Sequence, residues 1–293
     1  MTRLVEIVDA RDRLGEGPLW NRRHGRLWWT DIEGRRLRSL DPSSRSIRDV
    51  AVPERVGSFA FVAGRPEALL VAFETGLALF EPGTGSVEWL ARPEAIGSGR
   101  RFNDGRTDRQ GRFWTGTMVE DDGPAPPGSA SLWRLDGGGV LTECDGGVSI
   151  GNGLAASPDG ATLYFADSPH RRIVAYDLDP ATGAIAGKRL FAEIERGFPD
   201  GAAIDAEGCL WSARWGAGEV VRHAPDGKVV EVVKVPASQP SCVAFGGDDL
   251  SLLFVTSARD GLTAAELAED RNAGSLFVFE AEVIGLADAE YRS

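Results

Sequence analysis

The chain has 293 residues, of which 42% are hydrophobic and 26% are charged, and its formal net charge is −12. This acidic excess repels phosphate backbones and anionic lipids, so we expect neither nucleic acid nor a membrane as a partner. The first residues hold no apolar run of signal-peptide length, and no later segment approaches the ~20 apolar residues of a membrane span, which predicts a cytoplasmic protein.

One pattern returns six times along the chain: a polar residue, a stretch of small residues, a turn that contains glycine, and a hydrophobic strand. The polar members are Glu16, Ser58, Asp104, Asn152, Asp200 and Ser241, at intervals of 41 to 48 residues. Repeats of about 40 to 50 residues built from short strands are typical of a β-propeller with four-stranded blades. We therefore predict an all-β fold, a single six-bladed propeller domain over 1–293, in which these positions meet around one axis.

The hydrophobic strand of each repeat can be located in the sequence. In chain order these strands are expected at 27–30, 69–72, 113–116, 163–166, 210–213 and 253–256. The smaller residues before them suit inner strands that crowd around an axis. The runs 4–8 and 275–279 flank the repeats, and we predict that the N-terminal strand completes the last blade, so that strands from both ends close the ring.

Two segments depart from the strand pattern. The run 121–128, with sequence DDGPAPPG, is too rich in proline and glycine for a strand and is expected to form a loop over the mouth of the channel. The run 263–268, with sequence TAAELA, is a candidate for one or two helical turns.

Three of the repeated positions form a candidate cation site. Glu16, Asn152 and Asp200 stand at matched points of the first, fourth and fifth repeats, each beside a glycine. A single residue of this kind more often caps a turn, but three in register around one axis would converge at one end of the channel. Two carboxylates and an amide oxygen suit a hard divalent cation.

Other patterns carry weaker signals. Gly147–Gly151 fits the G-x-S-x-G pattern of serine hydrolases, but its serine leads into an inner strand and not into the helix that a nucleophile elbow requires. The histidines, His24, His170 and His223, fall in predicted outer turns or strands, where we expect surface or packing roles. The three cysteines are far apart and form no CxxC pair, which disfavours disulfides and a zinc knuckle.

Six motifs together carry a resemblance to a known family. They are LGEGPLW at 14–20, RFNDGRTD at 101–108, GRFWTGTM at 111–118, NGL at 152–154, PDG at 199–201 and TSARDG at 256–261. In this order and spacing they resemble the regucalcin (senescence marker protein) and gluconolactonase family over essentially the whole chain. The resemblance implies a six-bladed propeller that hydrolyses sugar lactones with one divalent metal.

The resemblance also implies residue roles. Glu16, Asn152 and Asp200 fall on metal-ligand positions, and Asp200 falls on the general base as well. Arg101, Asn103 and Asp121 fall on substrate-binding positions. Asp121 is shorter than the glutamate of mammalian regucalcins, which leaves its contact with substrate open. The repeat alignment places Asp104 in the polar ring, whereas the resemblance favours its neighbour Asn103.

The expected reaction is hydrolysis of an aldonolactone, such as glucono-, xylono- or arabinonolactone, with the metal polarising the carbonyl and Asp200 taking a proton from water. The ligand set leaves the metal open among Ca, Zn, Mn, Mg and Fe(II), and the oligomeric state is also open. Alternatives are a lactonase or esterase acting on non-sugar lactones or organophosphates, and a non-enzymatic calcium-binding propeller. Two converging carboxylates repel each other without a cation, which disfavours a mere scaffold.

Overall fold

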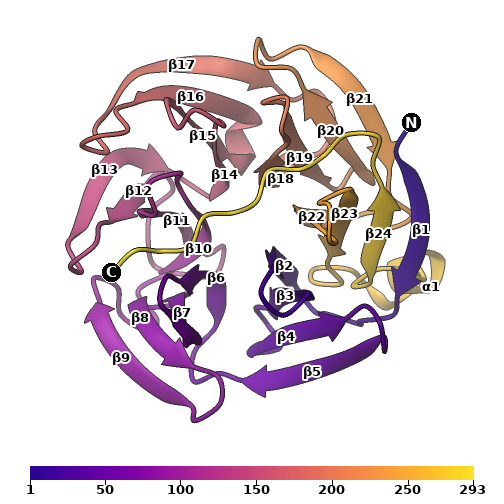
Figure 1. Cartoon of the computed structure of the whole chain (residues 1–293), viewed down its shortest axis with the longest axis horizontal. Coiled ribbons are helices and arrows are strands. Elements are labelled where there is room, and N and C mark those ends of the chain that lie inside the picture. Colours follow the sequence, from indigo (N-terminus) through magenta and orange to yellow (C-terminus); the bar gives the residue numbers. More distant parts are fainter.

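The computed structural model describes residues 1–293 and shows six four-stranded antiparallel sheets set around a central axis (Figure 1). From the innermost strand outward, blade 1 consists of β2 (Gly15–Asn21), β3 (Arg26–Asp31), β4 (Arg36–Asp41) and β5 (Ser46–Ala51). In the same order, blade 2 consists of β6 (Val56–Val62), β7 (Arg65–Phe73), β8 (Gly76–Glu81) and β9 (Ser86–Ala91). Blade 3 consists of β10 (Arg100–Thr107), β11 (Phe113–Val119), β12 (Ala130–Leu135) and β13 (Leu141–Val148). Blade 4 consists of β14 (Gly151–Ala156), β15 (Thr162–Asp167), β16 (Arg172–Leu178) and β17 (Ile185–Glu193). Blade 5 consists of β18 (Phe198–Ile204), β19 (Leu210–Trp215), β20 (Glu219–His223) and β21 (Val229–Lys234). Blade 6 consists of β22 (Pro240–Gly246), β23 (Leu252–Ser257), β24 (Leu276–Glu280) and β1 (Arg3–Val8). The predicted six-bladed β-propeller is confirmed.

Blade 6 takes its outermost strand from the N-terminus. Strand β1 pairs antiparallel with β24, in a register that runs from Arg3 opposite Glu280 to Val8 opposite Leu276. The indigo β1 and the yellow β24 lie side by side in Figure 1. The predicted closure of the ring by strands from both ends is therefore confirmed, and it joins the first and last repeats into one blade.

Two short helical segments lie outside the sheets. Helix α1 (Ala264–Glu269) begins after Thr263, whose hydroxyl accepts a hydrogen bond from the backbone N–H of Glu266 in a capping box. The helical turns predicted at 263–268 are thus confirmed. The 3-10 turn η1 (Ser168–His170) follows β15. Neither segment has the length and apolar character that a helix needs to traverse a bilayer.

All six repeated polar residues lie on innermost strands, at places where the strand pairing is irregular. The pairing shifts between residues 16 and 19, 56 and 58, 102 and 105, 152 and 155, 199 and 202, and 240 and 243. Gly17 and Gly153 have φ angles of 54° and 62°, in the left-handed region that glycine adopts without strain. Because a bulge re-aims the side chains around it, these irregularities turn Glu16 and Asn152 toward the channel.

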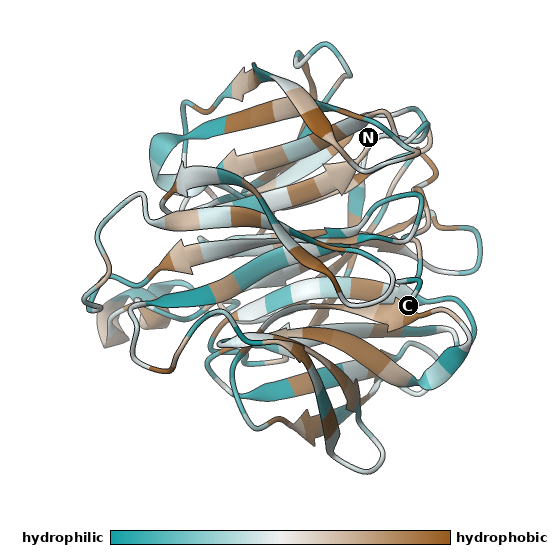
Figure 2. Ribbon diagram, turned by 90° about the vertical axis from the view of Figure 1, so that its left-hand side faces the viewer, coloured by the Kyte–Doolittle hydropathy of each residue, from teal (hydrophilic) through white to brown (hydrophobic).

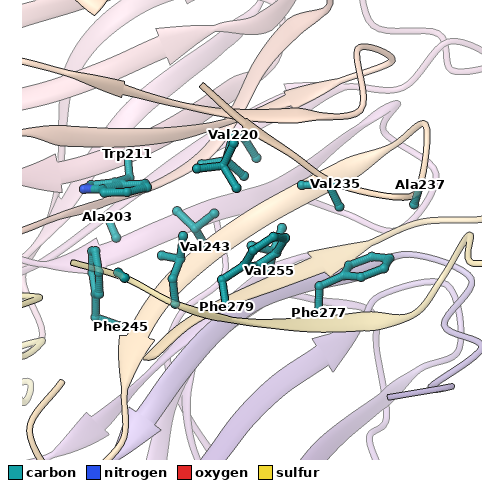
Figure 3. Packing of buried hydrophobic residues seen from close by; sticks show 14 of the residues in the cluster. Ala203, Trp211, Val220, Val235, Ala237, Val243, Phe245, Val255, Phe277 and Phe279 are labelled. Atoms are coloured by element: carbon teal, nitrogen blue, oxygen red, sulfur yellow. The ribbon is translucent and has the colours of Figure 1, made fainter. Parts of the chain in front are cut away.

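The hydrophobic core lies between neighbouring blades. In the largest cluster, Trp211 and Val220 of blade 5 pack against Val243, Phe245 and Phe277 of blade 6 (Figure 3). The rings of Trp211 and Phe245 meet edge to face, with centroids 5.6 Å apart. Figure 2 shows apolar residues concentrated along the strands and polar residues in many of the connecting turns. Burial of these large side chains holds adjacent blades in a fixed relation, and this rigid ring positions the channel.

Three buried tryptophans also form hydrogen bonds with an aspartate that precedes them by 6 or 17 residues. The indole N–H groups of Trp29, Trp114 and Trp211 donate to the carboxylates of Asp12, Asp108 and Asp205 over 2.8, 3.0 and 2.9 Å. A buried indole N–H needs such a partner, so each pair anchors the second strand of its blade to the loop beside it.

The C-terminal segment 281–293 crosses one end of the channel as an extended strap (Figure 1). It bonds to the ends of inner strands from several blades: the Tyr291 N–H donates to the Phe61 carbonyl over 2.7 Å, and Arg106 binds the Asp288 carboxylate at 2.7 Å. These contacts lie near the C-terminal ends of β6 and β10. The strap closes the end of the channel where inner strands finish.

Truncation of Tyr291 is expected to destabilise the propeller. Its side chain is 1% exposed among residues of blades 2 and 3, and its hydroxyl donates to the Asp136 carbonyl over 2.9 Å. Tyr291→Ala should lower the free energy of unfolding by about 3–5 kcal/mol, as aromatic truncations in a core do. Tyr291→Phe, which loses only the hydrogen bond, should cost about 1 kcal/mol. Urea denaturation measures both values, and equal stability of Tyr291→Ala and wild type would contradict this role.

Candidate active site

A cavity of about 450 Å³ lies at the opposite end of the channel, where the inner strands begin. All six residues predicted for the site line it: Glu16, Arg101, Asn103, Asp121, Asn152 and Asp200. They come from blades 1, 3, 4 and 5, so only the closed ring brings them together. A groove of about 590 Å³ on blades 4 and 5 contains none of these residues.

The side chains of Glu16, Asn152 and Asp200 are buried in this cavity, at 7%, 5% and 7% exposure. Burial, and next the negative charge of Asp104, raise the pKa of Glu16 to about 8. Burial and the charge of Glu16 raise the pKa of Asp200 well above its ordinary value. A cation bound between these two carboxyl groups would stabilise their ionised forms, which burial and mutual repulsion disfavour. The donor set thus fits a divalent metal.

The third donor of such a site is an amide. No group of three or more His, Cys, Asp or Glu side chains lies close enough to hold a metal ion. The amide oxygen of Asn152, which lines the same cavity as Glu16 and Asp200, is the third oxygen donor for a cation bound there. Oxygen ligands of this mixed kind are those that calcium, magnesium and manganese prefer.

The orientation of Asn152 is set by a chain of hydrogen bonds across three blades. Arg101 Nη1 donates to Asn103 Oδ1 over 2.8 Å, and Asn103 Nδ2 donates to Asn152 Oδ1 over 2.8 Å. Asn152 Nδ2 then donates to Ser168 Oγ over 2.9 Å, and the Ser168 hydroxyl donates to the Pro199 carbonyl over 2.7 Å. Because both amides are held at both ends, their oxygens have one defined direction.

Asp104 has a different place from Asn103. Its carboxylate accepts hydrogen bonds from the backbone N–H groups of Gly105 and Leu154, over 2.8 and 3.0 Å, and it does not line the cavity. It therefore joins the inner strands of blades 3 and 4. Ser58 also links inner strands, since its hydroxyl donates to the Asn103 carbonyl over 2.7 Å. Asn103, and not Asp104, faces the cavity.

The mouth of the cavity is acidic. Asp121 lines it from the loop after β11, and Asp260 lines it from the segment after β23. Residues 120–124 of the same loop line a second hollow that adjoins the first and shares Arg101, Asp121 and Asp260. The predicted loop over the mouth is confirmed. Arg101 is the one cation among the residues that line the cavity.

Several lining residues were not predicted as site residues. Ser168 follows β15 in the turn η1, and Asp260 lies in a motif to which no role had been given. Phe198 and Trp215 are direct partners across β18 and β19, and they form an apolar wall on blade 5. The one available signal for this pair was the position of Phe198 two residues before Asp200.

None of the three histidines lines the cavity. His24 and His170 are exposed. His223 is buried: its Nδ1–H donates to the Gly227 carbonyl over 2.9 Å, and its Nε2 accepts from Arg214 Nη2 over 2.6 Å. The expected surface or packing roles are confirmed.

Protonation of His223 should weaken the fold in mild acid. Burial lowers the pKa of His223 from 6.5 to about 4. The unfolded chain therefore binds a proton below pH 6.5 that the folded chain takes up only near pH 4, and stability falls as pH decreases through this window. Relative to His223→Gln, wild type should lose about 1.4 kcal/mol of unfolding free energy per pH unit there. Urea denaturation at several pH values measures the difference, and parallel curves would refute it.

The fold and the cavity define a class: a six-bladed propeller with a polar, acid-lined cavity at one end of its channel. The family described as SMP-30/Gluconolactonase/LRE-like region matches residues 14–259. The chain belongs to this family, and the predicted resemblance is confirmed.

Individual relatives match the chain over nearly its full length. It is 38% identical over 285 residues to a 6-deoxy-6-sulfogluconolactonase of Pseudomonas putida, with 96% of each chain covered. It is 38% identical to an L-arabinolactonase of Azospirillum brasilense, covering 97% of this chain and 94% of the relative. The crystal structure of regucalcin from Agrobacterium tumefaciens, described as a calcium-binding protein, is 34% identical and has a TM-score of 0.92 over 100% of this chain and 98% of that one.

Proposed function

We propose that this protein hydrolyses a sugar lactone, an aldonolactone of the glucono-, xylono- or arabinono- type, with one divalent metal ion. The observation that carries the proposal is that six residues from four blades, chosen from the sequence, line a single cavity. The names of the relatives, which include sugar lactonases for hexose and pentose derivatives, support the same substrate class.

Glu16, Asn152 and Asp200 would hold the metal, which when bound supplies a Lewis acid for the lactone carbonyl. Asp200, a carboxylate that lines the open cavity, takes the proton from the attacking water. Addition of water opens the ring by breaking the ester C–O bond, and the product is the aldonic acid. The hydrogen bonds of Asn152 with Asn103 and Ser168 keep its side chain in place during this step.

The residues that line the walls of the cavity would orient the substrate. Arg101, Asn103 and Asp121 present donors and acceptors suited to the hydroxyl groups of a polyol. Phe198 and Trp215 offer an apolar surface to the C–H face of a sugar ring. A pocket with one polar and one apolar wall would hold the lactone in one orientation and so favour attack on its carbonyl.

A lactone panel tests the proposal. Purified protein loaded with Ca, Mn, Mg or Zn should acidify solutions of gluconolactone, xylonolactone or arabinonolactone faster than buffer does, and should act more slowly on an apolar lactone or paraoxon. Faster turnover of paraoxon or the apolar lactone would favour an esterase of other substrates. Metal binding without turnover of any substrate would refute the enzyme and favour a calcium-binding protein.

A further inference from the structure

Arg55 is the centre of a charge network on the rim of the cavity. It lies just before β6, and its side chain is 16% exposed. Its guanidinium binds three carboxylates: Glu120 at 2.7 Å, Glu74 at 2.9 Å and Glu33 at 3.1 Å. These glutamates follow β11, β7 and β3, so the network connects blades 1, 2 and 3 beside the cavity mouth.

The network reaches the cavity through Arg101. Arg101 Nε is 3.8 Å from Glu120 Oε1, beyond hydrogen-bond distance, and it is buried with no hydrogen-bond partner. The Nη1 group of the same guanidinium donates to Asn103 Oδ1. The Glu120 carboxylate thus stands between two guanidinium groups, and its hydrogen bond is to Arg55.

The charges of the network act on Arg101, whose Nη1 donates to the Phe102 carbonyl and to Asn103 Oδ1 while its Nε faces Glu120. A carboxylate is a stronger acceptor than an amide oxygen, so Arg101 would leave Asn103 for Glu120 if Glu120 lost its partner. Without Arg55, Glu120 would have Arg101, whose Nε is already 3.8 Å from Glu120 Oε1, as a neighbouring cation. Movement of Arg101 would remove the donor to Asn103 Oδ1, while Asn103 Nδ2 would keep its bonds to Asn152 Oδ1 and to the Gly151 carbonyl.

We propose that Arg55 is a positioning residue: by binding Glu120 it keeps Arg101 turned toward Asn103 and the substrate. The inference rests on the proposed lactonase function. Arg55 lines neither the cavity nor the hollow beside it, so it acts through Arg101 and does not contact the substrate.

The test compares Arg55→Gln with wild type on the lactone that wild type hydrolyses best. Arg55→Gln should raise KM about tenfold, the effect of losing about one charge-assisted hydrogen bond to substrate, while kcat changes less than about threefold. The double variant Arg55→Gln/Glu120→Gln removes the competing carboxylate and should return KM to within about threefold of wild type. A purely structural role would not give this rescue.

Arg92→Gln is the matched control. Arg92 follows β9 of blade 2 and, like Arg55, binds a glutamate, Glu54 at 2.8 Å, but it does not line the cavity. Its KM should equal that of wild type. If Arg55→Gln does not fold, Arg55→Lys should fold and show a smaller rise in KM. An unchanged KM in Arg55→Gln, or a double variant as impaired as the single one, overturns the inference. Absence of wild-type turnover on every lactone instead refutes the proposed function.

Discussion

Asp200→Asn is expected to lower kcat for the lactone by about 10²–10⁴-fold, the range for loss of a general acid or base. Asparagine has nearly the same shape, but it carries no negative charge and cannot take a proton from water. The metal-free variant should be at least as stable as wild type, because burial and the neighbouring Glu16 already disfavour the ionised carboxylate. Loss of activity together with retained or increased stability is expected of a catalytic residue whose charge destabilises the folded protein.

Initial rates at saturating lactone and metal, together with thermal melts, measure both effects. Asp226→Asn is the control: Asp226 is an exposed aspartate of the same blade, next to Lys228 in the turn between β20 and β21. It should behave as wild type in both measurements. Retention of kcat by Asp200→Asn would refute its assignment as the base.

Removal of the metal is expected to abolish turnover and to lower stability. A cation placed between Glu16 and Asp200 offsets their repulsion, and binding to the folded chain alone stabilises it by about 2.7 kcal/mol at a hundredfold excess over Kd. Chelator-treated protein should therefore melt at a lower temperature, and Ca, Mn, Mg or Zn should restore the midpoint. This measurement detects the site independently of activity.

Glu16→Gln should lose most of the metal-induced rise in melting temperature, since it removes one of the two carboxylates. Glu88→Gln, which changes an exposed residue of β9, should keep the full rise. A rise of equal size in Glu16→Gln and wild type would place the metal elsewhere. For the wild-type protein, the size of the rise in melting temperature with each of the four metals also ranks their affinities.

Much of the candidate site could be predicted because it repeats with the fold. Glu16, Asn152 and Asp200 recur at the blade interval, and equivalent positions of a closed ring must approach one another. The choice between Asn103 and Asp104 could not be made from the repeat. The irregular pairing of β10 between Phe102 and Gly105 directs Asn103 to the cavity and Asp104 to blade 4.

The residues that were not predicted make contacts between segments that are far apart in the sequence. Ser168 matters because its hydroxyl reaches the Pro199 carbonyl of the next blade, and Arg55 matters because glutamates from three blades surround it. The strap 281–293 has no regular strand pattern, and scattered backbone hydrogen bonds hold it to the ends of inner strands and to the loops beside them.

By itself, the sequence determined the six blades, the closure of the last one, and which polar residues lie on inner strands. The composition of each strand and the interval between repeats are properties that the order of residues encodes directly. Only the tertiary structure decided that Asp104 turns toward blade 4, that Asn152 is held at both ends, that Arg55 binds Glu120, and that a strap covers the other end. These depend on which blades become neighbours and on how each bulge turns its strand, so they arise only when the ring closes.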